Sequence, residues 1–411
     1  MIDKFIAYAL RRPKLVFAIT GAAVLLSLFA FIRVKVDTDP ENMLPEKEFV
    51  RVFNHEVKKE FAIYDYIVLG VVNEQDPQGV FNPQTLETIY KITAEVKNIP
   101  GVIAYELMSL ANKDDIEQAG PGVISFRWLM GNPPYTLQDA LRIKTRALEN
   151  PLFYDTLISR DAKALCIYVP IEQKNMSYRV AKEIQRILKK YPGDEQYYLT
   201  GLPLAEDAFG VEMFWQMGIS APLAVLVIFL LMWWFFKHLV LVVMPLVMAV
   251  VVVIITMGLM VGLGFPIHIM SSMIPIFLLP ISVLDSIHIL NEFFEKYRTF
   301  KDKNKTITFV LKELYRPNLF TSLTTIAGFF SLSFAPIPPV QVFGIAVAFG
   351  VALAWLLTVL LIPAYIALLN DKKLGDFGVH EDELAQGVLS KFLSAWGRFT
   401  VNRWKAVLIG T

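Results

Sequence analysis

Six long apolar runs constrain the fold of this chain more than any other feature. Each approaches the roughly 17 to 25 residues that a helix needs to cross the hydrocarbon core of a membrane. The runs cover residues 15–32, 219–236, 239–262, 269–290, 319–334 and 342–369. The chain is also 55% hydrophobic, with a mean hydropathy of +0.48. These features predict an α-helical polytopic membrane protein.

The first apolar run begins like a secretory signal peptide, because basic residues precede it. It is longer than the apolar part of a signal peptide, however, and no small-residue cleavage site follows before Arg33. We therefore interpret residues 1–32 as a cytoplasmic N-terminus followed by a retained transmembrane helix.

Basic residues in the short loops predict the orientation in the membrane. If the six spans alternate, the Lys and Arg residues of 4–14, 237, 296–316 and 372–373 fall on one side. That side should be cytoplasmic, and Arg33 and Lys35 are the exceptions. We expect a multi-pass protein of the inner (plasma) membrane, with residues 33–213 extracytoplasmic and further spans in residues 214–370.

Residues 33–213 have the composition of a water-soluble domain, in which apolar runs alternate with helical patterns. Strands are predicted at 66–72, 102–107, 164–169 and 196–202, and helices at 83–97, 137–148 and 179–190. This alternation predicts an α/β domain with helices on one face of a sheet. A further helix, residues 205–217, should lead into the second span.

The C-terminal segment resembles the N-terminal one. Residues 371–390 are polar and acidic and are predicted to form a cytoplasmic linker. After it, SKFL (390–393) and RWKAV (403–407) match DKFI (3–6) and RPKLV (12–16). We interpret 391–411 as the start of a seventh span, so that this chain is the front half of a duplicated transporter. A coincidental match in an amphipathic tail is the alternative.

The fourth span contains the ionisable residues Asp285 and His288, three residues apart and therefore on one side of a helix. A carboxylate inside a span costs at least about 2.5 kcal/mol to insert and is seldom left facing lipid. We predict a proton relay in which Asp285 accepts the proton and His288 assists. A polar cluster that only fixes helix packing remains the alternative.

Further polar residues are predicted to support this relay. Asn291 extends the polar side of the fourth span, and the fifth span offers hydroxyls that hydrogen-bond Asp285 in one protonation state. These hydroxyls belong to Thr321, Ser322, Thr324 and Thr325. Gly328 is expected to allow close approach of a neighbouring helix. Ordinary hydrogen bonding between helices would give the same pattern.

Several classes of function lack sequence support. No nucleotide-binding G-x-x-x-x-G-K-[ST], nucleophile elbow or H-E-x-x-H sequence occurs, so we expect neither an enzyme nor a cofactor. The net charge of +1 gives no reason to expect a nucleic-acid partner. Cys166 is the single cysteine. Four carboxylates at Asp37, Asp39, Glu41 and Glu46 match no known metal-ligand spacing, so no metal site is predicted.

These features together resemble the resistance-nodulation-division (RND) superfamily. Within it, the chain is most similar to the branch of mycobacterial large membrane proteins (MMPL), hopanoid exporters and Patched-like proteins with sterol-sensing domains. The similarity lies in VLDSIHIL (283–290), FTSLTTIAGF (320–329), Phe343-Gly344 and Pro363-Ala364. Val283, Leu284 and Ser286 depart from the Gly-Val-Asp-Tyr signature usual beside the acid, which puts the tuning of the relay in doubt.

The resemblance implies a ferredoxin-like porter domain and proton-driven export of lipid or other hydrophobic cargo. The partner relay residues that the second half of such proteins supplies are absent from this chain. A sterol-sensing-like membrane protein that binds lipid and signals or scaffolds without net transport is the alternative. The sequence leaves open a homo-oligomer and a periplasmic partner.

Overall fold

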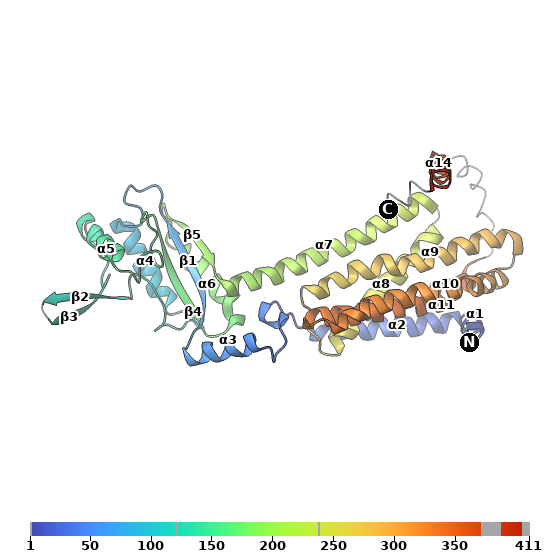
Figure 1. Ribbon diagram of the computed structural model, residues 1–411, viewed down its shortest axis with the longest axis horizontal. Helices are drawn as coiled ribbons and strands as arrows, with labels where there is room; N and C mark the ends of the chain where they lie inside the picture. Colours follow the sequence, from blue (N-terminus) through green and yellow to red (C-terminus); the bar gives the residue numbers. More distant parts are fainter. Residues whose placement is uncertain (1, 121, 237–238, 371–387, 405–411) are drawn as a thin grey trace. The chain divides into compact units, whose positions relative to one another are not determined.

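The computed structural model describes residues 2–120, 122–236, 239–370 and 388–404 (Figure 1). The chain forms two compact units. The helical unit comprises Met1–Asp37 and Trp215–Thr411, and the α/β unit comprises Thr38–Phe214. The predicted boundaries of the extracytoplasmic domain lie at residues 33 and 213.

The helical unit consists mainly of long helices. Its helices are α1 (Ile2–Arg11), α2 (Pro13–Ala30), the C-terminal part of α7 (Leu202–Phe236), α8 (Leu239–Gly262), α9 (Ile274–Phe300), α10 (Lys303–Ser331), α11 (Pro338–Leu368) and α14 (Val388–Asn402). The 3-10 helices η1 (Phe31–Arg33), η4 (Met270–Met273) and η5 (Leu332–Phe334) extend α2, α9 and α10.

Packing in the helical unit centres on α8, α9 and α11, whose apolar segments are half or more buried, whereas those of α2 and α7 are mostly exposed. Gly258 lets α8 approach α2 closely, because a Cβ at this position would lie 2.5 Å from Cβ of Ser27. Gly328, by contrast, faces open space among the described atoms, so the predicted close approach at this glycine is wrong.

Five helical segments of the described chain are long and apolar enough to cross a membrane. They are Pro13–Arg33, Leu202–Trp234, Val242–Gly262, Met270–Tyr297 and Pro338–Leu368. Five of the six predicted spans overlap these segments almost entirely. The remaining one, residues 319–334, forms the end of α10 together with η5, and α10 packs against α9 and α11. Its crossing of the membrane stays a prediction.

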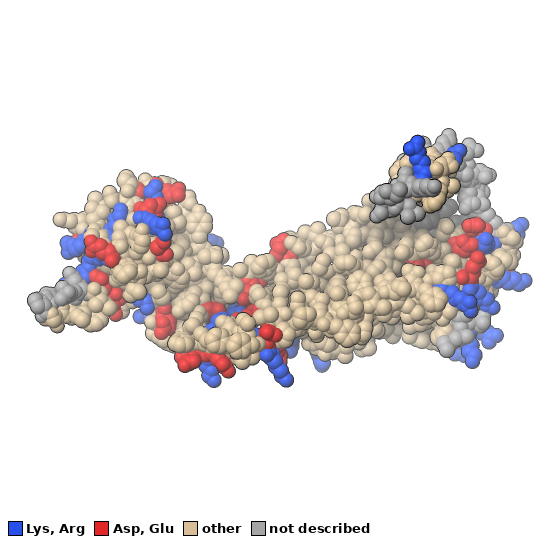
Figure 2. Space-filling model, in the orientation of Figure 1, with Lys and Arg blue, Asp and Glu red and all other residues tan. Residues whose placement is uncertain are grey.

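The turn between α9 and α10 is defined by local sequence. Lys301 ends α9 in the left-handed conformation, with φ of 49°. Asp302 then caps α10, since its side chain accepts hydrogen bonds from the backbone N–H groups of Asn304 and Lys305. In Figure 2, Lys and Arg side chains gather at the end of the helical unit where α9 meets α10, and few charges lie along the sides of its helices.

The α/β unit contains a three-stranded antiparallel sheet. Strand β1 (Asp65–Val72) lies between β4 (Ala164–Ile171) and β5 (Gln196–Thr200), with Leu69 opposite both Ile167 and Leu199. Helices α4 (Pro83–Val96) and α6 (Ser177–Leu188) contact each other and share a hydrophobic core with β1 and β4. The predicted α/β layers are confirmed.

Alternation along the strands explains this core. Ile67, Leu69 and Val71 of β1 are fully buried, while the residues between them are only partly buried. Gly201 follows β5 and leads into α7 with φ of +129°, where a side chain would collide with the backbone oxygen of Tyr66. Glycine is therefore required at this turn.

The predicted strand at 102–107 is wrong. Isolated bridges join Val102 to Ile171 and Met108 to Tyr168. The first segment therefore advances six residues between the two bridges, whereas β4 advances only three. Ile103 N–H donates to the carbonyl of Pro170, but Pro170 has no N–H to return the bond. This proline interrupts the ladder and prevents a regular edge strand.

Several elements of the α/β unit were not predicted. Helix α3 (Phe49–Glu60) follows the 3-10 helix η2 (Pro40–Met43), and a second 3-10 helix, η3 (Lys174–Met176), precedes α6. A two-stranded hairpin of β2 (Asp114–Gly120) and β3 (Val123–Trp128) precedes the predicted helix α5 (Leu137–Glu149).

The predicted linker, residues 371–390, lies almost entirely outside the described residues. Of the predicted start of a seventh span, residues 391–402 lie in helix α14, and 405–411 lie outside the described residues.

Candidate functional site

Asp285 lies on the buried side of α9. Ser282, Asp285, Ser286 and Ile289 follow the spacing of one helix face, and all four are buried. The adjacent Leu284 is exposed on another side of the helix. The helix period therefore places the carboxyl group in the interior of the bundle, as the sequence predicts.

The carboxylate of Asp285 is held by a neighbouring helix. Ser322 Oγ of α10 donates a hydrogen bond to Asp285 Oδ2 at 3.3 Å. Only 8% of Asp285 and 3% of Ser322 are exposed. Hydrogen bonds from hydroxyls to carboxylates are commonly about 2.5–2.7 Å long, so this one is loose. Within the described chain, no Lys, Arg or His forms an ion pair with Asp285.

Further buried hydroxyl groups of α9 and α11 gather around Met248 of α8. Ser286 Oγ donates to the backbone oxygen of Ser282 at 3.3 Å and approaches Sδ of Met248 in α8 at 3.6 Å. Thr358 Oγ1 of α11 approaches the same sulfur at 3.7 Å. These residues were not predicted as a group, although Ser282 and Ser286 lie three residues before and one residue after Asp285.

Some buried polar atoms in these helices have unused hydrogen-bonding capacity. In the described part of the chain, Thr256 Oγ1, Ser282 Oγ, Asn318 Nδ2 and Trp355 Nε1 make no hydrogen bond. Such groups are costly to bury unless water or a changed side-chain position satisfies them. These four atoms therefore retain hydrogen-bonding capacity that the described side chains do not use.

Most of the other predicted relay residues do not reach Asp285. His288 is exposed and, among the described residues, has neither a hydrogen bond nor an ion pair with Asp285. Asn291 is exposed as well. The hydroxyls of Thr321, Thr324 and Thr325 donate to carbonyls of their own helix, as Thr side chains in helices commonly do. Of the predicted hydroxyls, Ser322 is the one that contacts Asp285.

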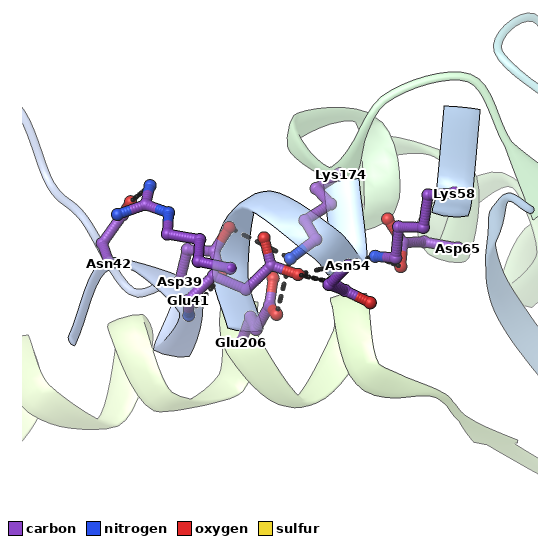
Figure 3. Close-up of polar contacts among 9 residues, drawn as sticks. Asp39, Glu41, Asn42, Asn54, Lys58, Asp65, Lys174 and Glu206 are labelled. Carbon is purple, nitrogen blue, oxygen red and sulfur yellow. Dashed lines mark hydrogen bonds and ion pairs between the residues drawn. The ribbon is translucent and has the colours of Figure 1, made fainter. Parts of the chain in front are cut away.

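A second polar cluster lies in the α/β unit (Figure 3). Lys174 Nζ donates to Asp39 Oδ2 at 3.0 Å and to Glu206 Oε1 at 3.2 Å. Burial alone would lower the pKa of Lys174, but the hydrogen bonds and charges of Asp39 and Glu206 outweigh it and raise that pKa. Lys174 thereby ties the segment that follows the first membrane helix to the start of α7.

The four carboxylates near Pro40 and Pro45 are separated by their partners. Asp37 pairs with His268 Nδ1 at 3.6 Å in the helical unit, and Asp39 pairs with Lys174 in the α/β unit. Glu41 lies 3.6 Å from Lys58 Nζ. Among the described residues, no group of three or more metal-ligating side chains comes together.

Comparison with known proteins places the chain in a family. Residues 84–407, which include the Asp285 site, match the MMPL family. The chain is also 22% identical over 379 residues to a protein of Methanocaldococcus jannaschii described as a membrane protein; the alignment covers 90% of this chain and 94% of that relative. The similarity to the mycobacterial large membrane proteins is thus confirmed, and the chain belongs to the MMPL family.

Proposed function

We propose that this protein takes part in RND-type export of lipid or other hydrophobic molecules across the inner membrane, driven by the proton-motive force. Membership of the MMPL family supports transport of hydrophobic substrates. The observation that carries the proton coupling is Asp285, a buried carboxyl group with a hydroxyl donor and no cationic partner among the described residues.

Asp285 acts as the proton carrier in this proposal. When ionised, its carboxylate accepts the hydrogen bond from Ser322. When protonated, it also carries an O–H donor that needs an acceptor, so its hydrogen bonding is rearranged. Protonation thus changes the contact between α9 and α10, and neighbouring hydroxyls such as Ser282 and Ser286 offer alternative partners.

The α/β unit acts as an extracytoplasmic porter domain of the ferredoxin-like type. The element order β1–α4–edge segment–β4–α6–β5, with β1 between β4 and β5, supports this assignment. The basic residues at the turn between α9 and α10 support a cytoplasmic location for that turn, and hence for the N-terminus.

Efflux from proteoliposomes tests the function. The full-length protein is reconstituted in vesicles that contain fluorescent lipid cargo, with and without an imposed pH gradient. We expect gradient-dependent efflux from wild type and none from Asp285→Asn. Thr324→Ala serves as the matched control, because it removes an exposed hydroxyl that bonds its own helix. Equal efflux from wild type and Asp285→Asn would contradict proton transfer by Asp285. Lipid binding without any efflux would favour the sensing or scaffolding alternative.

A further inference from the structure

Helix α3 of the α/β unit is amphipathic. Its polar side contacts the unit, whereas α4 and α6 bury their apolar sides. Arg51, Asn54 and Lys58 follow at spacings of three and four residues and so share one side. Phe49 and Phe53 lie on the other side. In α4 and α6 it is the apolar side that is buried in the core.

The polar side of α3 is bound to the protein. Arg51 Nη1 donates to the backbone oxygen of Leu44 at 2.8 Å, and its Nη2 donates to Asn42 Oδ1. Asn54 Nδ2 donates to Glu41 Oε1 at 3.0 Å, and Lys58 Nζ donates to Asp65 Oδ1 at 3.2 Å (Figure 3). These bonds fix the rotation of the helix about its axis.

The apolar side consequently faces away from the unit. Phe49 is 75% exposed, Val50 61% and Phe53 54%, and no residue of α3 is buried. The rings of Phe49 and Phe53 stack with centroids 5.8 Å apart and form an apolar patch on the N-terminal half of this side, whose C-terminal half carries Glu56 and Glu60. Burial of these two exposed phenylalanines against an apolar partner would lower the free energy.

We propose that the apolar side of α3 binds the surface of the lipid bilayer. The membrane helix α2, with its exposed Leu25, Leu26 and Phe29, ends a short way before α3 in sequence. Asp37 is held in the helical unit by a backbone bond from its N–H to the Ile267 oxygen. The 12 residues from Asp37 to Phe49 span at most about 43 Å, which keeps α3 within reach of that membrane.

The charge of the segment defines which lipid surface fits. Between Glu46 and Glu60 there are four basic residues (Lys47, Arg51, Lys58 and Lys59) and four acidic ones (Glu46, Glu48, Glu56 and Glu60), so the net charge is zero. Attraction to anionic headgroups is therefore not the driving force. Insertion of Phe49 and Phe53 between headgroups drives binding, and a zwitterionic bilayer is sufficient.

Fluorescence quenching by labelled lipids tests this contact. Full-length protein carrying Cys166→Ser and Phe53→Cys is labelled with a polarity-sensitive dye and reconstituted in phosphatidylcholine that contains a headgroup-level nitroxide lipid. The control carries His55→Cys, since His55 is exposed on the opposite side of the same helix. We expect quenching at position 53 to exceed that at 55 several-fold, and to change little when phosphatidylglycerol is added. Equal quenching at both positions overturns the proposal.

Two further measurements distinguish lipid from other partners. Phe49→Ser together with Val50→Ser removes exposed side chains only, so the unit should stay folded, as circular dichroism can verify. We expect this pair to lower quenching at position 53 to the level of position 55, and unchanged quenching overturns the proposal. Shielding of position 53 that disappears when the protein is diluted among vesicles overturns it in favour of a second copy of the chain.

Discussion

The helical unit and the α/β unit each bury an acid, but they treat it differently. Glu206, near the start of α7, is 5% exposed, and Asp285 in α9 is 8% exposed. Glu206 receives a hydrogen bond from Lys174, which also binds Asp39. Within the described residues, Asp285 receives its hydrogen bond from the neutral hydroxyl of Ser322.

This difference teaches that burial of an acid does not by itself indicate function. A buried carboxylate that is paired with a lysine is electrically compensated while it stays ionised. A buried carboxyl group beside neutral hydroxyls can be satisfied in either protonation state. The surroundings of Asp285 are therefore compatible with the proposed proton carrier, and those of Glu206 with a structural contact.

Replacing each acid by its amide should abolish transport at Asp285 and leave most of it at Glu206. Asp285→Asn is expected to lower gradient-driven efflux to background, because an amide neither takes up nor releases a proton near neutral pH. Glu206→Gln should retain most of the efflux, since Lys174 keeps Asp39 as a partner. Efflux from the same proteoliposomes measures both variants. Loss of efflux in Glu206→Gln but not in Asp285→Asn would reverse the comparison.

Removal of the cation should reveal the structural role of the α/β cluster. Lys174→Met leaves Glu206 buried without its positive partner and is expected to destabilise the α/β unit by about 3 kcal/mol. Hydrogen exchange of the β1 and β4 amides measures this loss. The control is Lys190→Met, which breaks a more exposed pair with Glu95. If the two variants show equal protection, Lys174 does not have the proposed role.

The hydroxyl that contacts Asp285 should matter more than its neighbours. Ser322→Ala removes one buried hydrogen bond, worth about 1 kcal/mol, and is expected to lower the rate of efflux by several-fold up to about tenfold. Thr321→Ala is the matched control, because its hydroxyl bonds the Pro317 carbonyl of its own helix. The ratio of the two rates is the decisive quantity, and a ratio near one would argue against the Asp285–Ser322 contact.

Much of the fold could be predicted from sequence, because the relevant signals are local. The lengths of the apolar runs indicate the membrane helices, and alternating patterns indicate β1, β4 and β5. The hairpin of β2 and β3 was missed although Ile124, Phe126 and Trp128 alternate with polar residues. The prediction of a strand at 102–107 was wrong because Pro170, far away in sequence, lacks the backbone N–H that would return the hydrogen bond from Ile103.

The candidate site was predictable only in part. Asp285 is conspicuous in sequence because a charged residue inside an apolar run is costly. Which hydroxyl reaches it depends on the rotation of α10, which places Ser322 inward and leaves Thr321 and Thr324 exposed. The pairing of Lys174 with Asp39 and Glu206 joins residues 135 and 32 positions apart, for which the sequence offers no local signal.

His288 should contribute little to proton transfer. The side chain is exposed and lacks a hydrogen bond to Asp285 among the described residues, so the relay predicted for it has no direct contact. His288→Ala is expected to lower efflux by less than about twofold, since its charge acts on Asp285 only at a distance. The same efflux assay, repeated across a range of pH, measures this. A defect as deep as that of Asp285→Asn would restore the histidine to the relay.

The smallest effect is expected at an exposed acid of the α/β unit, whose charge is paired but not buried as deeply as that of Glu206. Lys190 Nζ and Tyr191 Oη each donate to Glu95 at 2.6 Å, and these hydrogen bonds lower the pKa of Glu95 below 4.5. A pKa that is lower in the folded state stabilises the fold above the unfolded value, and this contribution is lost as pH falls through the folded pKa. Thermal unfolding of wild type should therefore show slightly more loss of stability below about pH 4.5 than Glu95→Gln. Glu87→Gln, the control, removes the same charge together with an exposed ion pair to Lys91 within α4. An identical acid slope in wild type and Glu95→Gln would mean that this pair contributes nothing, which would sharpen the contrast with the buried pair at Lys174.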